Sequence, residues 1–101
     1  MLVAFSVAPT TATTDDGSVA EAVAAAVRVV RESGLPNRTS SMFTEIEGPD
    51  WETVMDVVRR ATEAVLAVSP RVSLVLKADI RPGYDGQLDA KVARVEQALT
   101  D

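Results

Sequence analysis

The stretch that decides the fold runs from residue 40 to residue 51 and reads SSMFTEIEGPDW. Its alternation of apolar and polar side chains is typical of a strand, and Gly48-Pro49 then interrupts that pattern. Asp50 follows directly and is a preferred residue for capping the start of a helix. The stretch therefore predicts a strand that turns into a helix, with Glu45 and Glu47 on the strand face opposite to Ile46.

The residues before this stretch predict a strand, a loop and a helix. Residues 2–9 (LVAFSVAP) alternate as a strand whose apolar face is formed by Val3, Phe5 and Val7. Residues 10–17 are polar and predict a loop, and Ser18-Val19-Ala20-Glu21 matches a capping box that opens a helix. The apolar stripe of that helix is expected to consist of Val19, Val23, Val27 and Val30.

The central and C-terminal residues predict further strands and helices. Residues 38–47 are read as a hairpin of two short strands, although one long strand would also fit the pattern. The helix that begins after Asp50 is expected to turn Trp51 and Val68 toward the core. Residues 71–80 (RVSLVLKADI) form the clearest strand, with Leu74, Leu76 and Ile80 on its helix-facing side. A final amphipathic helix is marked by Leu88, Val92, Val95 and Leu99.

This order of elements predicts an α+β fold of the ferredoxin-like βαββαβ type with an extra C-terminal helix, and residues 1–101 are expected to form a single domain. Its four-stranded antiparallel sheet would carry two helices on one face. The other face would then be open to solvent or buried by another subunit.

Composition excludes several classes of function. The 101 residues carry a net charge of −5, and their ten Lys and Arg residues are scattered, which argues against nucleic acid as a partner. The chain has no cysteine and no histidine, so disulfides and imidazole-based catalysis are excluded. No apolar run is long enough to cross a membrane and no cofactor motif is found. We expect a soluble cytoplasmic protein without a cofactor.

The open face of the predicted sheet holds the candidate functional residues. Alternation places Ser6, Lys77 and Asp79 there, together with Glu45 and Glu47. These carboxylates are either ligand contacts or ion-pair partners of Lys77 and Arg81 across the sheet.

Three segments together resemble the small thiamine-binding protein family. They are FSVAP in the first strand, MFTEIEG followed by WETVMDVV, and VLKADIRPG followed by LDAKVARVE. The residues at matching positions of the family pattern are Thr44, Ile46, Glu47, Gly48, Val54, Met55, Lys77, Asp79, Arg81, Lys91 and Val92. The similarity extends over essentially the whole chain.

The resemblance implies a non-catalytic homodimer or homotetramer, paired through its sheets, that binds thiamine or its hydroxymethylpyrimidine moiety. Carried over position by position, the ligand-binding residues would be Thr44, Glu47 and Asp79, then Ser6, Glu45 and Phe43. Glu47 could equally be a structural carboxylate that accepts hydrogen bonds from the start of the second helix. A structural or regulatory module whose open sheet serves only assembly is the alternative function.

Overall fold

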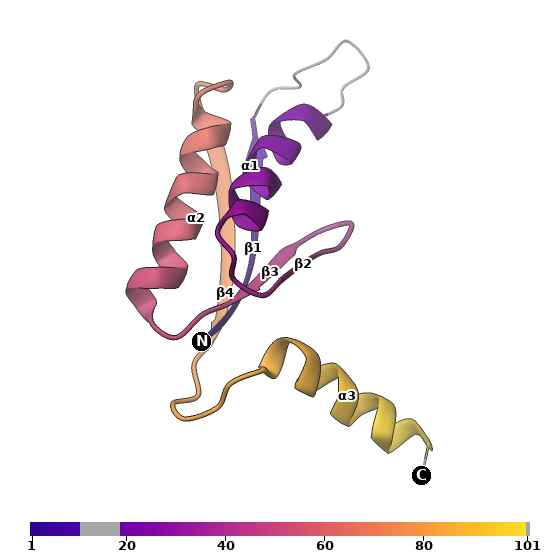
Figure 1. Cartoon of the computed structure of the whole chain (residues 1–101). Helices are drawn as coiled ribbons and strands as arrows, with labels where there is room; N and C mark the ends of the chain where they lie inside the picture. Colours follow the sequence, from indigo (N-terminus) through magenta and orange to yellow (C-terminus); the bar gives the residue numbers. More distant parts are fainter. Residues whose placement is uncertain (11–18, 101) are drawn as a thin grey trace.

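The computed structural model describes residues 1–10 and 19–100. Within them the order of elements is β1 (Leu2–Pro9), α1 (Ala20–Glu32), β2 (Asn37–Thr39), β3 (Thr44–Glu47), α2 (Trp51–Leu66), β4 (Val72–Asp79) and α3 (Gln87–Thr100) (Figure 1). The strands form an antiparallel sheet in the order β2-β3-β1-β4. The predicted ferredoxin-like α+β fold is confirmed, with α3 as the additional helix.

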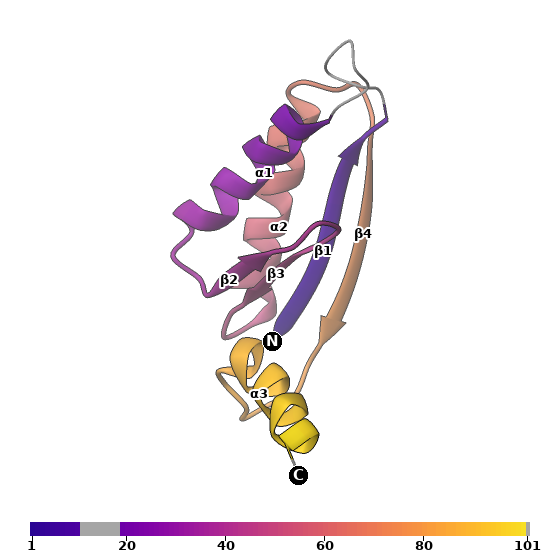
Figure 2. The ribbon, with the colours of Figure 1, turned by 90° about the vertical axis from the view of Figure 1, so that its right-hand side faces the viewer.

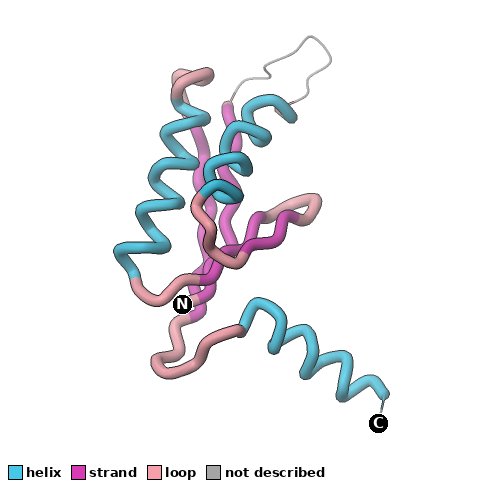
Figure 3. Tube along the Cα trace, in the orientation of Figure 1, coloured by secondary structure: helices cyan, strands magenta, loops and turns pink. Residues whose placement is uncertain are grey.

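Two layers make up the body of the molecule. Helices α1 and α2 lie side by side on one face of the sheet, and the opposite face of β1 and β4 is left uncovered by them (Figure 2). The trace in Figure 3 shows α3 leading away from this body. The core fills the space between the helices and the sheet and consists of Val3, Phe5, Val7, Ala22, Ala26, Val30, Ile46, Val54, Val57, Val58, Ala61 and Val65.

Strand register decides which side chains share a face. Phe5 pairs with Thr44 of β3 and with Leu76 of β4, so these three side chains face the helices. Ala4, one residue earlier, pairs with Glu45 and Lys77, which therefore lie on the open face. The predicted placement of Glu45, Lys77 and Asp79 on this face is confirmed, because Asp79 pairs with Leu2 in the same register.

The hairpin reading of residues 38–47 is correct. Strands β2 and β3 are joined by a turn in which the Ser40 backbone N–H donates to the Phe43 carbonyl at 2.9 Å, and the Ser40 hydroxyl donates to the same oxygen at 3.1 Å. β3 is short, and its pairing with β1 ends at Phe5 and Thr44, whereas β4 accompanies β1 as far as Pro9.

Four side chains expected to face the core or the helices are exposed. Leu74 lies within β4 opposite Val7, but it is 42% exposed on this edge strand. Trp51 is 55% exposed, because it occupies the first position of α2 and burial along that helix begins only at Val54. Val68 and Ile80 are also exposed, because α2 ends at Leu66 and β4 ends at Asp79. Val68 and Ile80 lie past the ends of their elements, where periodicity no longer predicts direction, whereas Trp51 is the first residue of α2.

The packing of α1 also differs from the prediction. Its buried residues are Ala22, Ala26 and Val30, whereas Val23 and Val27 are only half-buried. The reason is close packing, since the small alanines let α1 approach the sheet and α2, and the bulkier valines then flank that contact. Val19 is the N-cap and makes no side-chain cap hydrogen bond; Ser18 of the expected capping box lies outside the described residues.

Gly48 is required at the exit from β3 for a steric reason. A Cβ at this position would lie 2.6 Å from Cγ2 of the fully buried Val54. Replacement of Gly48 by alanine is therefore expected to lower the free energy of unfolding by about 3 kcal/mol, as overpacking does. In urea denaturation, a Gly48→Ala/Val54→Ala variant should be no less stable than Val54→Ala alone, because the clashing methyl group is gone. If the double variant instead loses the sum of the free energies lost by Gly48→Ala and Val54→Ala, the steric explanation is wrong.

Candidate functional site

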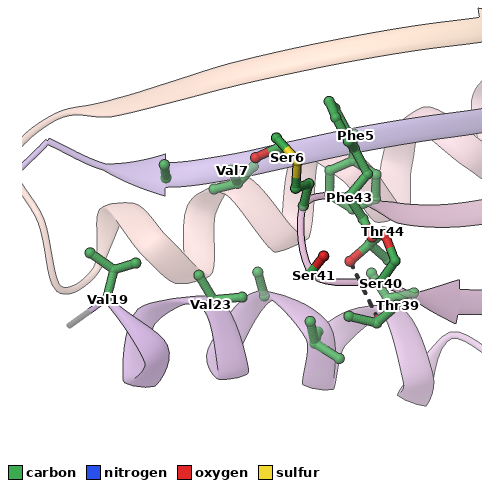
Figure 4. Close-up of a pocket in the computed structure, with 15 residues that line it drawn as sticks. Phe5, Ser6, Val7, Val19, Val23, Thr39, Ser40, Ser41, Phe43 and Thr44 are labelled. Carbon is green, nitrogen blue, oxygen red and sulfur yellow. Dashed lines mark hydrogen bonds between the residues drawn. The ribbon is translucent and has the colours of Figure 1, made fainter.

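A cavity of about 210 Å³ opens where β1 continues beyond the end of β3. Its walls come from the second half of β1, from α1 and from the turn between β2 and β3 (Figure 4). The unequal strand lengths create this space, because the edge of β1 beyond Phe5 has no paired strand on this side among the described residues. The cavity is therefore a direct result of the short hairpin.

The lining combines aromatic and aliphatic surface with hydroxyl groups. Phe5, Phe43, Val23 and Val27 provide apolar surface, and Val23 and Val27 are the valines that do not enter the core. The hydroxyl-bearing residues of the lining are Ser6, Thr39, Ser40, Ser41 and Thr44. None of the described residues that line the cavity has an ionisable side chain. This lining suits a small, flat, uncharged molecule with hydrogen-bonding groups on its rim.

Thr44 is the most buried hydroxyl-bearing residue of the cavity, at 8% exposure. Its Oγ1 lies 3.4 Å from Oγ1 of Thr39, and either hydroxyl can donate (Figure 4). The Ser41 hydroxyl has no hydrogen-bond partner among the described residues, so it is available to a ligand. The Ser6 hydroxyl is also unpaired, but Ser6 pairs with Val75 and lies between Phe5 and Val7, so its side chain points to the open face at the edge of the cavity. Each hydroxyl can both donate and accept, which allows the set to match more than one pattern of ring nitrogens and amino groups.

The six sequence-predicted site residues fall into two groups. Ser6, Phe43 and Thr44 line the cavity beside α1. Glu45, Glu47 and Asp79 lie instead on the open side of the sheet, near the start of α3. Adjacent strand residues point to opposite faces, so Thr44 and Glu45 cannot contact the same small ligand on one side of the sheet.

Glu47 is held by the backbone of α3. Its carboxylate accepts hydrogen bonds from the N–H groups of Gln87 at 2.9 Å and Leu88 at 3.0 Å, and the residue is only 7% exposed. The start of α2 is capped by a different residue, Asp50, whose Oδ1 accepts from the Thr53 N–H at 2.8 Å. Of the two roles considered for Glu47, the structure shows a structural contact, but to the third helix and not to the second.

Asp79 is paired with α3 as well. The Lys91 ammonium lies 2.6 Å from its Oδ2, and this hydrogen bond together with the lysine charge holds the pKa of the Asp79 carboxyl below its usual value. Lys77 and Arg81 act in the same direction more weakly. A second hollow of about 430 Å³ lies here on the open face and is lined in part by Glu45, Lys77 and Lys91. Its rim is charged with both signs, unlike the cavity beside α1.

Two structural patterns, a metal-ligand cluster and a membrane-spanning helix, are absent from the described part of the chain. Residues 1–10 and 19–100 contain no group of three His, Cys, Asp or Glu side chains placed to hold a metal ion. None of the described helices is both long and apolar enough to cross a bilayer.

Comparison with known proteins gives a consistent family assignment. Residues 3–96 match the family model described as "Thiamine-binding protein". A UPF0045 protein of Mycobacterium bovis is 54% identical over 99 residues, which cover 98% of this chain and 94% of that protein. A UPF0045 protein of Synechocystis is 36% identical over 83 residues, which cover 81% of this chain and 68% of that protein.

Solved structures agree on the fold. A DUF77 domain of unknown function from Bacillus cereus has a TM-score of 0.78 at 32% identity, with coverage of 92% of this chain and 86% of that one. A protein of Thermotoga maritima described as a candidate for thiamine biosynthesis or salvage has a TM-score of 0.73 at 22% identity, with coverage of 92% and 97%. At that lower identity the likeness shows the shared fold alone.

Proposed function

The chain belongs to the thiamine-binding protein family, and from this premise we propose that it binds the hydroxymethylpyrimidine moiety, free or as part of thiamine, in the cavity beside α1. It does so as a cytoplasmic homo-oligomer and without catalysing a reaction. Phe43 and Thr44 are the central contacts, with Ser6 on the rim.

The observation that carries this proposal is the match between the cavity lining and an aminopyrimidine. A flat heteroaromatic ring can pack against the phenyl ring of Phe43, while its ring nitrogens and amino group need both donors and acceptors. The hydroxyls of Thr44 and Ser41 supply both. The volume of about 210 Å³ is below the roughly 300 Å³ at which pockets for drug-sized ligands begin, which favours a single ring.

The absence of charge in the described lining favours one orientation of thiamine. A cationic thiazolium ring buried among Phe43, Val23 and Val27 would lose its hydration without gaining a counter-charge. The pyrimidine end therefore enters the cavity, and the thiazolium end stays at the mouth in contact with water. Free hydroxymethylpyrimidine should then bind about as tightly as thiamine.

Binding without chemistry is supported by the same lining. A serine or threonine hydroxyl becomes a nucleophile when a neighbouring base takes its proton. The hydroxyls of Thr44, Ser6 and Ser41 have no such base beside them among the described lining residues. The described part of the lining offers positioning groups and no general acid or base.

Self-association is supported by the open sheet face. Ala4, Ser6, Ala8 and Val75 form a flat surface of small and apolar side chains that neither α1 nor α2 covers. Glu45 and Lys77 flank Ala4 in one row of the sheet, so a second copy related by a two-fold axis can set unlike charges against each other. An assembly module without a ligand is the alternative function, and it uses this same surface.

Calorimetric titration separates these functions. We expect hydroxymethylpyrimidine and thiamine to bind with similar affinity and about one site per chain, and an unrelated base such as cytosine to give no saturable heat. Measurements at two temperatures guard against a vanishing enthalpy. An oligomer that gives no heat with either ligand would leave the assembly module as the function.

A further inference from the structure

The edge of β1 that borders the cavity carries backbone groups without a protein partner. In an antiparallel ladder, the two residues of a hydrogen-bonded pair exchange both of their N–H to C=O bonds, and such pairs alternate along the strand. On the β3 side the Met1 ammonium donates to the Gly48 carbonyl at 2.8 Å, and the Met1 carbonyl accepts from the Gly48 N–H at 3.0 Å. Odd-numbered residues of β1 therefore direct their backbone groups toward β3.

The bonds on the other side of β1 agree with this assignment. The Thr10 N–H donates to the Arg71 carbonyl at 3.1 Å, in the same register that pairs β1 with β4. Even-numbered residues of β1 therefore bond to β4. Val7 and Pro9 are odd-numbered, so their backbone groups point to the β3 side, at a level that β3 does not reach.

The hairpin turn explains why β3 does not reach this level. Phe5 pairs with Thr44, so the same register continued along β1 would set Val7 opposite Met42. Met42 lies instead in the turn between β2 and β3 and is 75% exposed. The Val7 N–H and C=O consequently have no hydrogen-bond partner among the described residues, and Val7 borders the cavity (Figure 4).

Two further observations show that this edge is exceptional. β1 is a central strand and Val7 is only 6% exposed, yet more than about 90% of buried backbone N–H and C=O groups in proteins are paired. Pro9 lies on the same side of β1, and proline within sheets is confined mostly to edges, where its missing N–H would meet no partner strand. The Val7 groups are therefore expected to bond to water or to a ligand.

We propose that the aminopyrimidine completes the sheet at this point, with the Val7 N–H donating to a ring nitrogen and the Val7 C=O accepting from the neighbouring amino group. The inference rests on the proposed function and adds the contact that selects the ligand. One edge of hydroxymethylpyrimidine carries an amino donor next to a ring-nitrogen acceptor, and one residue of an extended strand presents the complementary pair. The ring takes the place of a strand residue, about 4.8 Å from β1.

This contact defines a chemical class of ligand. Rings with an amino group beside an unprotonated ring nitrogen match the Val7 edge. Rings with an oxo group beside a ring N–H carry the reverse pattern, so they set donor against donor and acceptor against acceptor. The hydroxyls of Thr44 and Ser41 cannot make this distinction, because each can both donate and accept. The Val7 backbone has a fixed polarity and therefore determines specificity.

Calorimetric titration with matched ligands tests the contact in the natural protein. The oxo counterpart of hydroxymethylpyrimidine, in which only the amino group is replaced, should bind at least about 100-fold more weakly, because both Val7 groups lose their partner. Cytosine has the same edge but lacks the methyl and hydroxymethyl groups, so its failure to bind tests the rest of the cavity. Equal affinities for hydroxymethylpyrimidine and its oxo counterpart would overturn the inference.

Amide hydrogen exchange followed by NMR locates the contact. The Val7 N–H should exchange rapidly in the free protein and at least about tenfold more slowly with saturating hydroxymethylpyrimidine. The matched control is the Val3 N–H, which faces Ile46 in the ladder and should be protected with and without ligand. Exchange at Val7 that the bound ligand does not slow would overturn the inference.

Val7→Pro removes the donor without removing a hydrogen bond to β4, as natural Pro9 shows. The ratio of the affinities for hydroxymethylpyrimidine and its oxo counterpart should fall to about 10 or less in this variant. Val7→Ala keeps the N–H and should retain the natural ratio, which controls for the altered side chain. An unchanged ratio in folded Val7→Pro would overturn the inference. If Val7→Pro does not fold, the ligand pair and the exchange measurement decide the question in the natural protein.

Failure of this inference and failure of the proposed function give different results. If neither hydroxymethylpyrimidine nor its oxo counterpart binds, the proposed function and the Val7 contact are both wrong. If the two ligands bind equally well, the chain binds pyrimidines as proposed, and only the Val7 contact is wrong.

Discussion

Replacing Glu47 with alanine is expected to lower the free energy of unfolding by about 3 kcal/mol, measured by urea denaturation. The carboxylate accepts from the N–H groups of Gln87 and Leu88 in a part of the molecule where Glu47 is nearly fully buried. Its removal leaves these donors without their partner, and an unsatisfied buried group costs roughly 1 to 3 kcal/mol. The variant should also show faster hydrogen exchange in the first turn of α3 than in α2.

The matched control for this prediction is Glu45→Ala. Glu45 is two residues away on the same strand and face, but its side chain makes no hydrogen bond or ion pair within the described residues. Its replacement should change the free energy of unfolding by less than about 0.5 kcal/mol. If both variants lose the same free energy of unfolding, the contact between Glu47 and α3 does not explain the loss in Glu47→Ala. Unaltered hydroxymethylpyrimidine affinity in Glu47→Ala would confirm that this residue is structural only.

A phenylalanine at Val23 is expected to reduce hydroxymethylpyrimidine affinity by about 100-fold or more, equivalent to roughly 2.7 kcal/mol. Val23 lies on α1 and faces the cavity, where a phenyl ring would take the space proposed for the pyrimidine (Figure 4). The residue is half-buried, so the larger side chain should fill empty volume without overpacking the core. Calorimetric titration gives the affinity, and thermal unfolding without ligand checks the fold.

The control for the cavity uses the same ring on the outside of the same helix. Ala24 is exposed and does not line the cavity, so Ala24→Phe should bind the ligand as the natural protein does. If Val23→Phe binds hydroxymethylpyrimidine as tightly as the natural protein does, the ligand does not bind in this cavity. The hollow beside Glu45, Lys77 and Lys91 on the open face would then become the next site to examine.

Much of the fold could be predicted because each element carries a local signal. The alternation in residues 2–9 and 71–80, and the Gly48-Pro49-Asp50 junction, correspond to β1, β4 and the start of α2. Errors occurred at element ends and in the buried stripe of α1. Trp51 and Ile80 continue an apolar pattern by type, but they stand where the sheet or helix no longer supplies a surface to pack on.

The site was only partly predictable. The resemblance identified Phe43, Thr44 and Ser6, which the structure brings together in one cavity. It also pointed to Glu45, Glu47 and Asp79, which lie on the open side of the sheet, where Glu47 and Asp79 are tied to α3. The sequence did not predict that Val23 lines the cavity, because valines at helical spacing usually form the buried stripe of a helix. A signal was present in the neighbouring alanines, which allow closer packing than valines do.

The sequence by itself determined the elements, their order and the two faces of each strand, because periodicity of two or 3.6 residues is a property of neighbouring positions in the chain. Tertiary structure alone decided that Glu47 caps α3, forty residues away, and that a short β3 leaves a cavity beside the longer β1. Both depend on where one element ends relative to another. Strand lengths and helix directions are settled by packing between distant segments, and no local pattern encodes them.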